Sequence, residues 1–480
     1  MNKRTKILAT IGPASSSAAI IAKLIHAGMD AARLNFSHGD RRDHQRRIRL
    51  IRSEAKKAGK HIAIIQDLQG PKLRVGEMKD GAVMLKKGAD ITLTTRRVLG
   101  TSELVSVTYP RLTRDLQVDD RVLLDDGRLE LKVVRKVLNG LQCKVMCGGL
   151  LRSHKGVNLP GAQLSLPSLS HKDREDLVFG AEQNVDYIAL SFVRAAEDIV
   201  NTRRFLRTLD RSTPIIAKIE KPEAVENLDE IIAAADGIMV ARGDLGVEVS
   251  PEQVPLLQKA IINACNAAEK PVITATQMLE SMIENSQPTR AEASDVANAI
   301  LDGTDCVMLS GETAMGKYPV QSVEVMARIA VHTETSLSPI PADVHVSTAG
   351  ESVAHAACRA AEEQRAKAIV AFTQSGSTAL LVSKHRPAVR IIAATPAERI
   401  ARLVSLYWGV VPILVKTKRT TDDMINSVER AMLRQKIVEN RDLIVITAGV
   451  PVGVAGSTNM MKIHHVGEAE SLEFRNERIR

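Results

Sequence analysis

Short, almost continuously hydrophobic runs alternate with longer amphipathic stretches along much of the chain. Runs of this kind are expected for parallel strands that are covered on both faces, and the stretches between most of them have helical spacing. Eight consecutive parallel strands alternating with helices predict a (β/α)8 barrel, because an open doubly wound sheet rarely has so many. The eight runs cover residues 6–11, 31–36, 61–67, 187–192, 215–220, 237–242, 272–276 and 306–310, with helical patterns at 251–269 and 291–301.

The segment between the third and fourth runs has a different character. It is strand-like and rich in turns, and the steps Asp80-Gly81, Asp126-Gly127 and Asn139-Gly140 are hairpin signals. This change predicts an all-β domain inserted into a barrel loop. We therefore expect a discontinuous barrel from 1–70 and 167–340 and an inserted β-barrel domain at 71–166.

An α/β pattern returns after about residue 340, with strand-like runs at 366–372, 389–395 and 442–448. We expect a separate C-terminal α/β domain at 341–480, with Ser338–Pro341 as a linker. A helix start is also explicit, since Thr289 and Glu292 fit a capping box.

Composition narrows the class of protein. The chain has 480 residues, 44% hydrophobic and 25% charged, which excludes disorder on a large scale. Six Phe, four Tyr and one Trp are few for a protein that stacks single-stranded bases. The net charge of +9 is concentrated in 40–60, where nine Lys/Arg face three Asp/Glu. Ile48, Ile51 and Ala55 recur there at helical spacing, which favours a surface helix with a solvated basic face over a nucleic-acid patch.

The cysteines and the hydrophobic runs indicate the compartment. Cys143 and Cys147 lie close together, but no second pair or His is near them, and their segment is strand-like, which argues against a zinc site. No run of about 18 apolar residues occurs. We therefore expect a reduced, cytoplasmic protein that does not bind membranes.

Polar residues that could take part in catalysis or ligand binding follow most of the predicted barrel strands. In a barrel, the working groups lie at the carboxyl ends of the strands, so these residues would converge on one mouth. Strands that only pack have no use for such groups, since burying a charge without a partner is costly. The residues are Arg33, Asn35, Ser37, His38, Asp67, Lys218, Glu220, Gly243, Asp244, Thr276, Ser310 and Glu312.

Lys218, Glu220 and Asp244 form the most informative part of this set. Lys218 and Glu220 are two residues apart on one predicted strand, so they face the same side, and Asp244 follows the adjacent strand. Two carboxylates with room for water suit Mg2+ or Mn2+. A lysine beside them can stabilise a developing negative charge. The alternative is a buried ion pair that only holds the barrel together, but such pairs stabilise less well than apolar packing.

Arginines and oxygen-bearing side chains point to a phosphate ligand. Arg33 and Arg74 together suggest a phosphate clamp, although each alone is typical of a solvated surface arginine. Asn35, Ser37 and Asp67 could coordinate an ion or orient a phosphate. A local turn explains Ser37 equally well.

Nine segments, in order along nearly the whole chain, resemble the pyruvate kinase family. The resemblance implies a barrel with an inserted lid domain and a C-terminal regulatory domain. It also implies transfer of the phosphoryl group of phosphoenolpyruvate to ADP, giving pyruvate and ATP in the last step of glycolysis. The segments are TKILATIGPAS, ARLNFSHG, DLQGPKLRVG, KGVNLPG, AKIEKPEAVENLDEI, MVARGDLGVE, ITATQMLESM, PTRAEASDVANAILDGTDCVMLSGETAMGKYP and GVPVGVAGSTN.

The resemblance assigns roles residue by residue. Glu220 and Asp244 would hold Mg2+, and Lys218 would stabilise charge on the phosphoryl group and the enolate. The substrate would meet Arg33, Lys218, Gly243, Asp244 and Thr276, and the nucleotide would meet Asn35, Ser37, His38, Arg74 and Lys155. The monovalent-cation positions match Asn35, Ser37, Asp67 and Leu68. Thr276, or a water near Ser310, is the candidate proton donor to the enolate.

Two positions depart from the family pattern near the monovalent-cation region. Potassium-dependent members carry Glu where this chain has Lys72 and Thr where it has Leu68. An ammonium at position 72 could replace the cation, so we expect no requirement for K+.

A turn rich in hydroxyls matches the family's effector site, with Thr373, Ser375, Ser377 and Thr378. Ser377 stands where a basic residue is often found, which argues against fructose 1,6-bisphosphate. A sugar monophosphate or AMP is the alternative effector. The turn could also act only as a helix N-cap.

Two other functions stay open from the sequence. A Mg-dependent enolpyruvate lyase or aldolase could use the same barrel, in the aldolase case through a Schiff base on Lys218. A basic nucleic-acid-binding protein would use the helix at 41–60. The resemblance implies a homotetramer and a cytoplasmic location.

Overall fold

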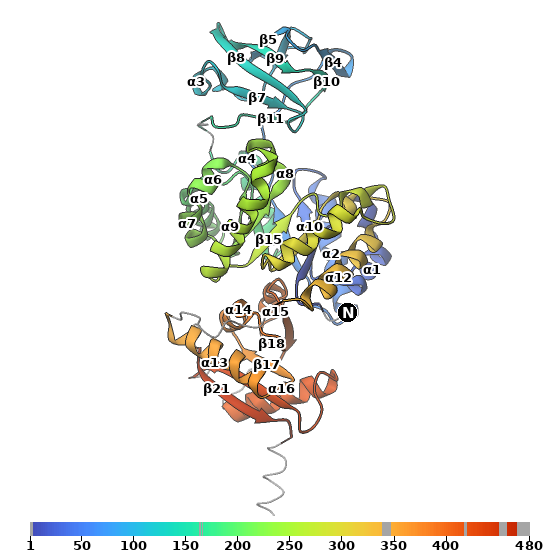
Figure 1. Ribbon diagram of the computed structural model, residues 1–480, viewed down its shortest axis with the longest axis vertical. Helices are drawn as coiled ribbons and strands as arrows, with labels where there is room; N and C mark the ends of the chain where they lie inside the picture. The colour runs from blue at the N-terminus through green and yellow to red at the C-terminus, as the bar shows by residue number, and fades with distance from the viewer. Residues whose placement is uncertain are drawn as a thin grey trace, which may run out of the picture.

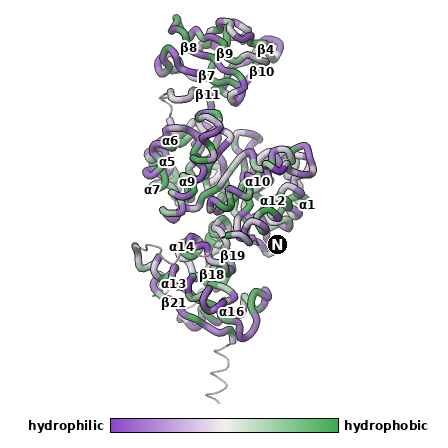
Figure 2. The backbone as a smooth tube through the Cα atoms, viewed as in Figure 1, coloured by the Kyte–Doolittle hydropathy of each residue, from purple (hydrophilic) through white to green (hydrophobic). Residues whose placement is uncertain are grey.

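The computed structural model describes residues 3–162, 165, 167–337, 347–416, 420–450 and 458–467. Figure 1 shows three lobes stacked along the long axis: the β-rich insertion at the top, the barrel in the middle and the C-terminal domain at the bottom. Hydrophobic stretches occur in all three lobes in Figure 2, so each has its own core. The predicted linker at 338–341 lies outside the described residues.

The central lobe is a closed barrel of eight parallel strands, as the hydrophobic runs predict. All but two of the strand residues are buried, which explains why the runs are continuous rather than alternating. The exceptions, Arg33 and Asn35, face the mouth. The strands are β1 (Lys6–Thr10), β2 (Ala31–Asn35), β3 (Ala63–Asp67), β12 (Tyr187–Leu190), β13 (Ile215–Ile219), β14 (Gly237–Ala241), β15 (Val272–Ala275) and β16 (Cys306–Leu309).

Helices surround the barrel and begin where the sequence predicts. Thr289 N-caps α10: its hydroxyl accepts from the Glu292 amide at 3.2 Å, and the Glu292 carboxylate accepts from the Thr289 amide at 2.7 Å. The helix predicted from Ile48 and its neighbours is α2, which buries its apolar stripe. The helices are α1 (Ala18–Ala27), α2 (Arg41–Lys57), α4 (His171–Glu182), α5 (Ala196–Thr208), α6 (Pro222–Glu226), α7 (Leu228–Ala234), α8 (Arg242–Glu248), α9 (Val254–Ala267), α10 (Arg290–Leu301), α11 (Gly311–Ala314) and α12 (Pro319–Glu334).

The inserted β domain, which we call the lid, lies between β3 and α4. Its described strands form one six-stranded sheet and one two-stranded sheet. The segment that enters the lid links the two edges of the larger sheet, because Arg74 pairs with Gly156 at one edge and Val75 pairs with Val107 at the other. A short helix, α3 (Leu112–Asp115), precedes β7. The strands are β4 (Ala82–Leu85), β5 (Asp90–Thr94), β6 (Leu104–Ser106), β7 (Arg121–Leu124), β8 (Leu129–Val137), β9 (Gly140–Cys147), β10 (Gly149–Arg152) and β11 (Val157–Asn158).

Two of the three hairpin signals in the lid are confirmed. Asp126-Gly127 joins the antiparallel strands β7 and β8, and Asn139-Gly140 joins β8 and β9. Asp80-Gly81 is a turn with positive φ at both residues, but it closes no hairpin, because β4 follows it and pairs with the distant β10. Cys143 is buried on β9 while Cys147 is exposed, and both are free thiols.

The C-terminal domain is a five-stranded sheet in the order β19-β18-β17-β20-β21, parallel except for β21. Two of these strands were missed in the sequence. β19 contains Pro412, which weakens a strand signal, and edge strand β21 is largely polar. The strands are β17 (Ala368–Phe372), β18 (Arg390–Thr395), β19 (Val410–Leu414), β20 (Leu443–Gly449) and β21 (Thr458–His465), with helices α13 (Ala349–Glu363), α14 (Ser377–Lys384), α15 (Glu398–Val404) and α16 (Thr421–Arg434).

Charged contacts hold the C-terminal domain against the amino ends of the barrel strands. Asp305, which precedes β16, accepts from Lys384 at 2.6 Å and from Arg386 at 2.8 Å. Asp186, which precedes β12, accepts from Arg402 at 2.9 Å. The C-terminal domain therefore covers one end of the barrel, and the carboxyl ends of the strands face the lid (Figure 1).

Candidate active site

Lys218 is the centre of a buried charge cluster at the carboxyl end of β13. Its ammonium lies 2.7 Å from Glu220 Oε1 and 3.2 Å from Asp67 Oδ1. Burial alone would lower the pKa of Lys218, but the carboxylates of Asp67 and Glu220 outweigh it, so the pKa lies above its ordinary value. Lys218 therefore carries a fixed positive charge.

Asp67 joins this cluster to Arg33. Its Oδ2 accepts from Arg33 Nε at 2.5 Å, and a second nitrogen of Arg33 donates to Thr10 Oγ1 at 3.1 Å. Burial would raise the pKa of Asp67, but Arg33 and Lys218 lower it below its ordinary value. Two cations thus share one ionised carboxylate, and the register of β2 against β3 places Asn35 beside Asp67.

Glu220 and Asp244 fit a hard divalent cation. Burial raises the pKa of Glu220 and the nearby negative charge of Asp244 raises it further, against the opposing effect of Lys218. A divalent cation would relieve that repulsion. No group of three or more His, Cys, Asp or Glu residues able to hold a metal occurs among the described residues. A pair of carboxylates is the donor set expected for Mg2+, which keeps several waters and substrate oxygens.

Gly243 and Thr276 meet beside this pair. The Gly243 amide donates to Thr276 Oγ1 at 2.6 Å. A Cβ on residue 243 would lie 3.2 Å from that oxygen, so glycine allows the close approach. At the end of β16, the Ser310 hydroxyl is buried without a hydrogen-bond partner.

A second basic group forms where the lid joins the barrel. Partial burial lowers the pKa of His38, and the positive charges of Arg74, Lys72 and Arg33 lower it further. The positive charges of Arg74, Lys72 and Arg33 therefore all act on His38, although Arg74 and Lys72 belong to the lid connection. Concentrated positive charge of this kind suits a polyphosphate.

The remaining sequence-predicted nucleotide and cation residues have local partners. Asn35 Oδ1 accepts from the Ser37 amide at 3.1 Å, and the Leu68 carbonyl accepts from Ser191 Oγ at 2.7 Å. Lys155 lies on the lid, 2.7 Å from Asp125 Oδ1. No contact in the described part of the chain joins Lys155 to Arg33 or Lys218.

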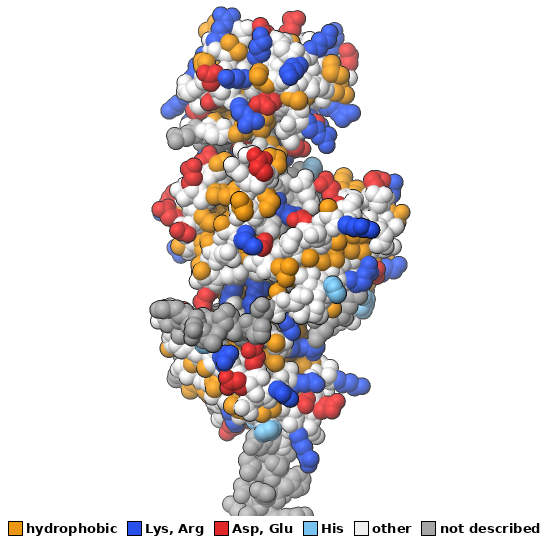
Figure 3. All heavy atoms as spheres, viewed as in Figure 1, with side chains coloured by type: hydrophobic (Ala, Val, Ile, Leu, Met, Phe, Trp, Pro, Cys, Tyr) orange, Lys and Arg blue, Asp and Glu red, His pale blue; other side chains and the backbone are white. Residues whose placement is uncertain are grey.

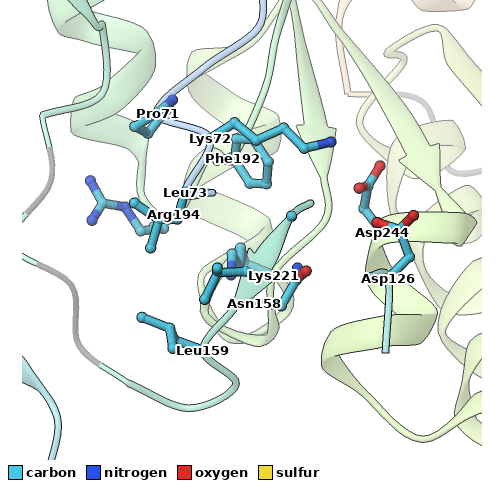
Figure 4. Close-up of a pocket in the computed structure, with 12 residues that line it drawn as sticks. Pro71, Lys72, Leu73, Asp126, Asn158, Leu159, Phe192, Arg194, Lys221 and Asp244 are labelled. Carbon is cyan, nitrogen blue, oxygen red and sulfur yellow. The ribbon is translucent and has the colours of Figure 1, made fainter. Parts of the chain in front are cut away.

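The lid lies close over the mouth. Figure 4 shows the cavity between them, with the ammonium of Lys72 extended toward the side where Asp244 lies. Its volume is about 40 Å³, and Lys218, Glu220 and Thr276 are not among the residues that line it. Asn158 on the lid donates to Glu248 on α8 at 2.9 Å. The side chains that line this cavity include those of Lys72, Asp126, Asn158, Phe192, Lys221 and Asp244.

The hydroxyl-rich turn of the C-terminal domain precedes α14. Gly376 caps this helix in a left-handed conformation, with φ of 98°, and its amide donates to Thr373 Oγ1 at 2.8 Å. Ser375 and Ser377 share a hydrogen bond of 3.0 Å, while buried Thr378 pairs with Thr458 at 2.8 Å. The turn leaves the hydroxyls of exposed Ser375 and half-buried Ser377 at a helix N-terminus.

Sequence reasoning missed Ser191 and Phe192. Ser191 Oγ accepts from Lys218 at 2.7 Å, and the Phe192 amide donates to Glu220 Oε2 at 2.9 Å. Both follow β12, a barrel strand for which no candidate residue was named. Their position directly after a predicted barrel strand could have identified them, since the carboxyl ends of all strands of a barrel lie at the same mouth.

Family models match both large parts of the chain. The model "Pyruvate kinase, barrel domain" matches residues 2–323, and "Pyruvate kinase, alpha/beta domain" matches 351–464. The chain belongs to the pyruvate kinase family.

Curated relatives and solved structures agree with this membership. The chain is 49% identical to pyruvate kinases of Staphylococcus haemolyticus and Geobacillus stearothermophilus, over 97% and 98% of its length and 81% of theirs. It resembles the crystal structure of a pyruvate kinase from Cryptosporidium parvum with a TM-score of 0.90, 38% identity and coverage of 97% and 96%.

The family reaction transfers the phosphoryl group of phosphoenolpyruvate to ADP, and this chain is a pyruvate kinase by family, fold and length of match. The enolpyruvate lyase or aldolase that the sequence left open finds no support in these comparisons. None of the described helices is long and apolar enough to span a membrane. On the face drawn in Figure 3, Lys and Arg side chains are mixed with Asp and Glu over all three lobes.

Ser191→Ala tests whether the ammonium of Lys218 must be held from the β12 side. The change removes a hydrogen bond to a charged group, and we expect kcat/KM for phosphoenolpyruvate to fall by about tenfold. Steady-state kinetics measure it, with the exposed Ser347→Ala as the control. An unchanged kcat/KM for Ser191→Ala would contradict this role.

Proposed function

We propose that this pyruvate kinase carries out its reaction at the lid-facing barrel mouth, with Lys218 as the fixed cation and with Mg2+ or Mn2+ on Glu220 and Asp244. The supporting observation is the continuous chain of contacts from Arg33 through Asp67 and Lys218 to Glu220. Phosphoryl transfer needs positioning and neutralised charge more than covalent chemistry, and this arrangement supplies both.

Lys218 acts as a charge, not as a nucleophile. A Schiff-base lysine needs a lowered pKa so that its amine is free, whereas the carboxylates around Lys218 raise its pKa. The ammonium would stabilise the negative charge on the phosphoryl group in transit and on the enolate oxygen left behind. Arg33, held by Asp67, would bind the phosphoryl oxygens from the other side.

Glu220 and Asp244 would hold the divalent ion, which supplies charge neutralisation at the carboxylate and enolate side of the substrate. The amide of Gly243 and the hydroxyl of Thr276 would orient that carboxylate. Thr276, or a water at the unpartnered hydroxyl of Ser310, would then deliver the proton to the enolate carbon. This proton step completes pyruvate.

The nucleotide would enter under the lid. Asn35, Ser37, His38 and Arg74 would bind its phosphates, and the charges that lower the pKa of His38 support a polyphosphate there. Lys155 would have to leave Asp125 to join them, which lid movement over the mouth allows.

Glu220→Gln tests the metal site. We expect kcat to fall by about 10²- to 10³-fold, because one group that neutralises developing charge is lost. The assay couples pyruvate release to lactate dehydrogenase and omits phosphoenolpyruvate, ADP and Mg2+ in turn.

The control for this experiment is Glu175→Gln, an exposed carboxylate on α4. Paramagnetic resonance titration of Mn2+ should show weaker binding to Glu220→Gln only. If both variants bind Mn2+ equally well, the metal does not lie on Glu220.

We also propose that the enzyme needs no monovalent cation. Both oxygens of Asp67 already contact Arg33 and Lys218, and the ammonium of Lys72 adds fixed positive charge to the region of His38. The positive charge of Lys72 would replace the positive charge that K+ supplies in relatives with Glu at position 72.

Lys72→Glu should therefore create a K+ requirement. In a buffer balanced with tetramethylammonium, we expect the parent enzyme to work at full rate without K+ and the variant to be stimulated by KCl. Lys86→Glu, an exposed lid position, is the charge-matched control. Strong stimulation of the parent enzyme by KCl would overturn the proposal.

The turn at Thr373–Thr378 is proposed as the effector site, with Ser375 and Ser377 offering hydroxyls at the N-terminus of α14. A sugar monophosphate or AMP fits a turn without a basic side chain better than a bisphosphate. Calorimetric titration with each should show binding that Ser377→Asp abolishes. No heat from any of them would remove the proposal and leave the turn as a helix cap.

A homotetramer and a cytoplasmic location complete the proposal, and light scattering and cell fractionation measure them. The exposed side chains of Met461 and Ile463 on edge strand β21 are available to such an assembly.

A further inference from the structure

Two consecutive residues at the end of β15 adopt a backbone conformation that their side chains disfavour. Thr276 has φ of 67° and Gln277 has φ of 54°. Left-handed backbone is a clear outlier for a β-branched residue such as threonine. Such conformations persist only where the surrounding structure imposes them, and they cluster at functional sites.

The guanidinium of Arg242 contacts the backbone of both residues. Its Nη2 donates to the Thr276 carbonyl at 2.8 Å and to the Gln277 carbonyl at 3.2 Å, and its Nε donates to the Thr276 carbonyl at 3.3 Å. The carbonyls of two successive residues thus face one guanidinium. The planar, rigid donor set of arginine suits this geometry, and a lysine could not reproduce it.

Two helices fix the guanidinium from its other side. Arg242 Nη1 lies 2.7 Å from the carboxylate of Asp295 on α10 and 3.3 Å from Gln258 Oε1 on α9. Only 8% of Arg242 is exposed. A buried charge with this many partners has one orientation, and the two carbonyls are therefore held in one place.

The held turn determines the position of Thr276 Oγ1. That oxygen accepts from the amide of Gly243 at 2.6 Å, and Gly243 directly follows Arg242 in α8. The side chain of Arg242 thus binds the carbonyls of the turn, and the amide of Gly243 donates to the hydroxyl of Thr276 in the same turn.

We propose that Arg242 is a positioning residue for the phosphoryl-transfer reaction. It keeps Thr276 Oγ1 and the Gly243 amide paired in the place where the carboxylate of the three-carbon substrate binds, and it does not touch the substrate. The inference rests on the proposed binding of that carboxylate by Gly243 and Thr276.

A purely structural role would have a different signature, and Arg203 provides the comparison. Arg203 on α5 also donates to a backbone carbonyl, that of Ala234 at 2.9 Å, and to a carboxylate, that of Asp236 at 2.9 Å. Its contacts lie at the amino end of β14, away from the mouth. Loss of either arginine should lower thermal stability, but only Arg242 should affect the substrate.

The experiment compares Arg242→Met, Arg242→Lys and Arg203→Met in the full-length enzyme. Misplacing a binding group by about 1 Å can cost up to ~10²-fold. For both Arg242 variants we expect kcat/KM for phosphoenolpyruvate to fall by about 10- to 100-fold through a higher KM, with the KM for ADP unchanged. Arg203→Met should retain the parent values for both substrates. Equal kinetic losses in Arg203→Met and Arg242→Met would overturn the proposal.

A rescue variant separates positioning from general damage. Gln277 is exposed, and its side chain makes no hydrogen bond within the described residues. Glycine adopts positive φ without strain, so Gln277→Gly should restore part of the KM in the Arg242→Met background. It should do nothing for Arg203→Met. No restoration by Gln277→Gly contradicts the claim that Arg242 acts through this turn.

Asp295→Asn keeps the proposal testable if Arg242→Met does not fold, because the carbonyl contacts of Arg242 survive in it. We expect an intermediate rise in the KM for phosphoenolpyruvate, and an unchanged KM would count against the proposal. Thr276→Ala tests the underlying carboxylate site. If Thr276→Ala keeps the parent KM while Arg242→Met does not, the site assignment fails and the positioning role needs another target.

Discussion

A single buried ammonium, that of Lys218, organises the catalytic end of this molecule. Burial of an isolated charge is very costly, so Lys218 must have carboxylate partners, and it has Asp67 and Glu220. Each of these carboxylates in turn needs a further positive charge. Arg33 supplies it for Asp67, and in the proposed mechanism a divalent cation supplies it for Glu220 and Asp244. In this proposal, the substrate and its metal ion add the charges that balance those of Lys218, Glu220 and Asp244.

The fold determines where that pattern can face. At the amino ends of the barrel strands, Asp305 and Asp186 form ion pairs with basic residues of the C-terminal domain. The carboxyl ends are left for chemistry, and the lid covers them. Asn158 and Glu248 connect the lid to α8, the helix whose first turn carries Gly243 and Asp244. Lid position and site geometry are therefore physically linked through one short helix.

Much of this arrangement could be predicted from the sequence, since both the barrel and its charged strand ends follow from simple periodicity. Lys218 and Glu220 share one side of a strand because side chains alternate, and the structure joins them to Asp67 and Arg33. Ser191 was missed because a serine ending a hydrophobic run has no pattern of its own. The role of Ser191 becomes visible only when the barrel places it beside Lys218.

Other features depend on long-range pairing that periodicity does not encode. Arg74 and Val75 pair with Gly156 and Val107, which lie at opposite edges of the six-stranded lid sheet, and periodicity gives no sign of these partners. The left-handed backbone of Thr276 is equally invisible in the sequence, because threonine gives no sign of positive φ and Arg242 acts from the first turn of α8.

The central claim, that the charges around Lys218 bind one divalent ion together with the substrate, can be measured directly. Crystals grown with Mn2+ and phosphoenolpyruvate, without ADP, would give an anomalous difference map at the manganese edge. We predict one strong peak within coordination distance of both Glu220 and Asp244, with the phosphoryl group beside Lys218 and Arg33. A peak elsewhere, or substrate bound away from Lys218, would contradict the account.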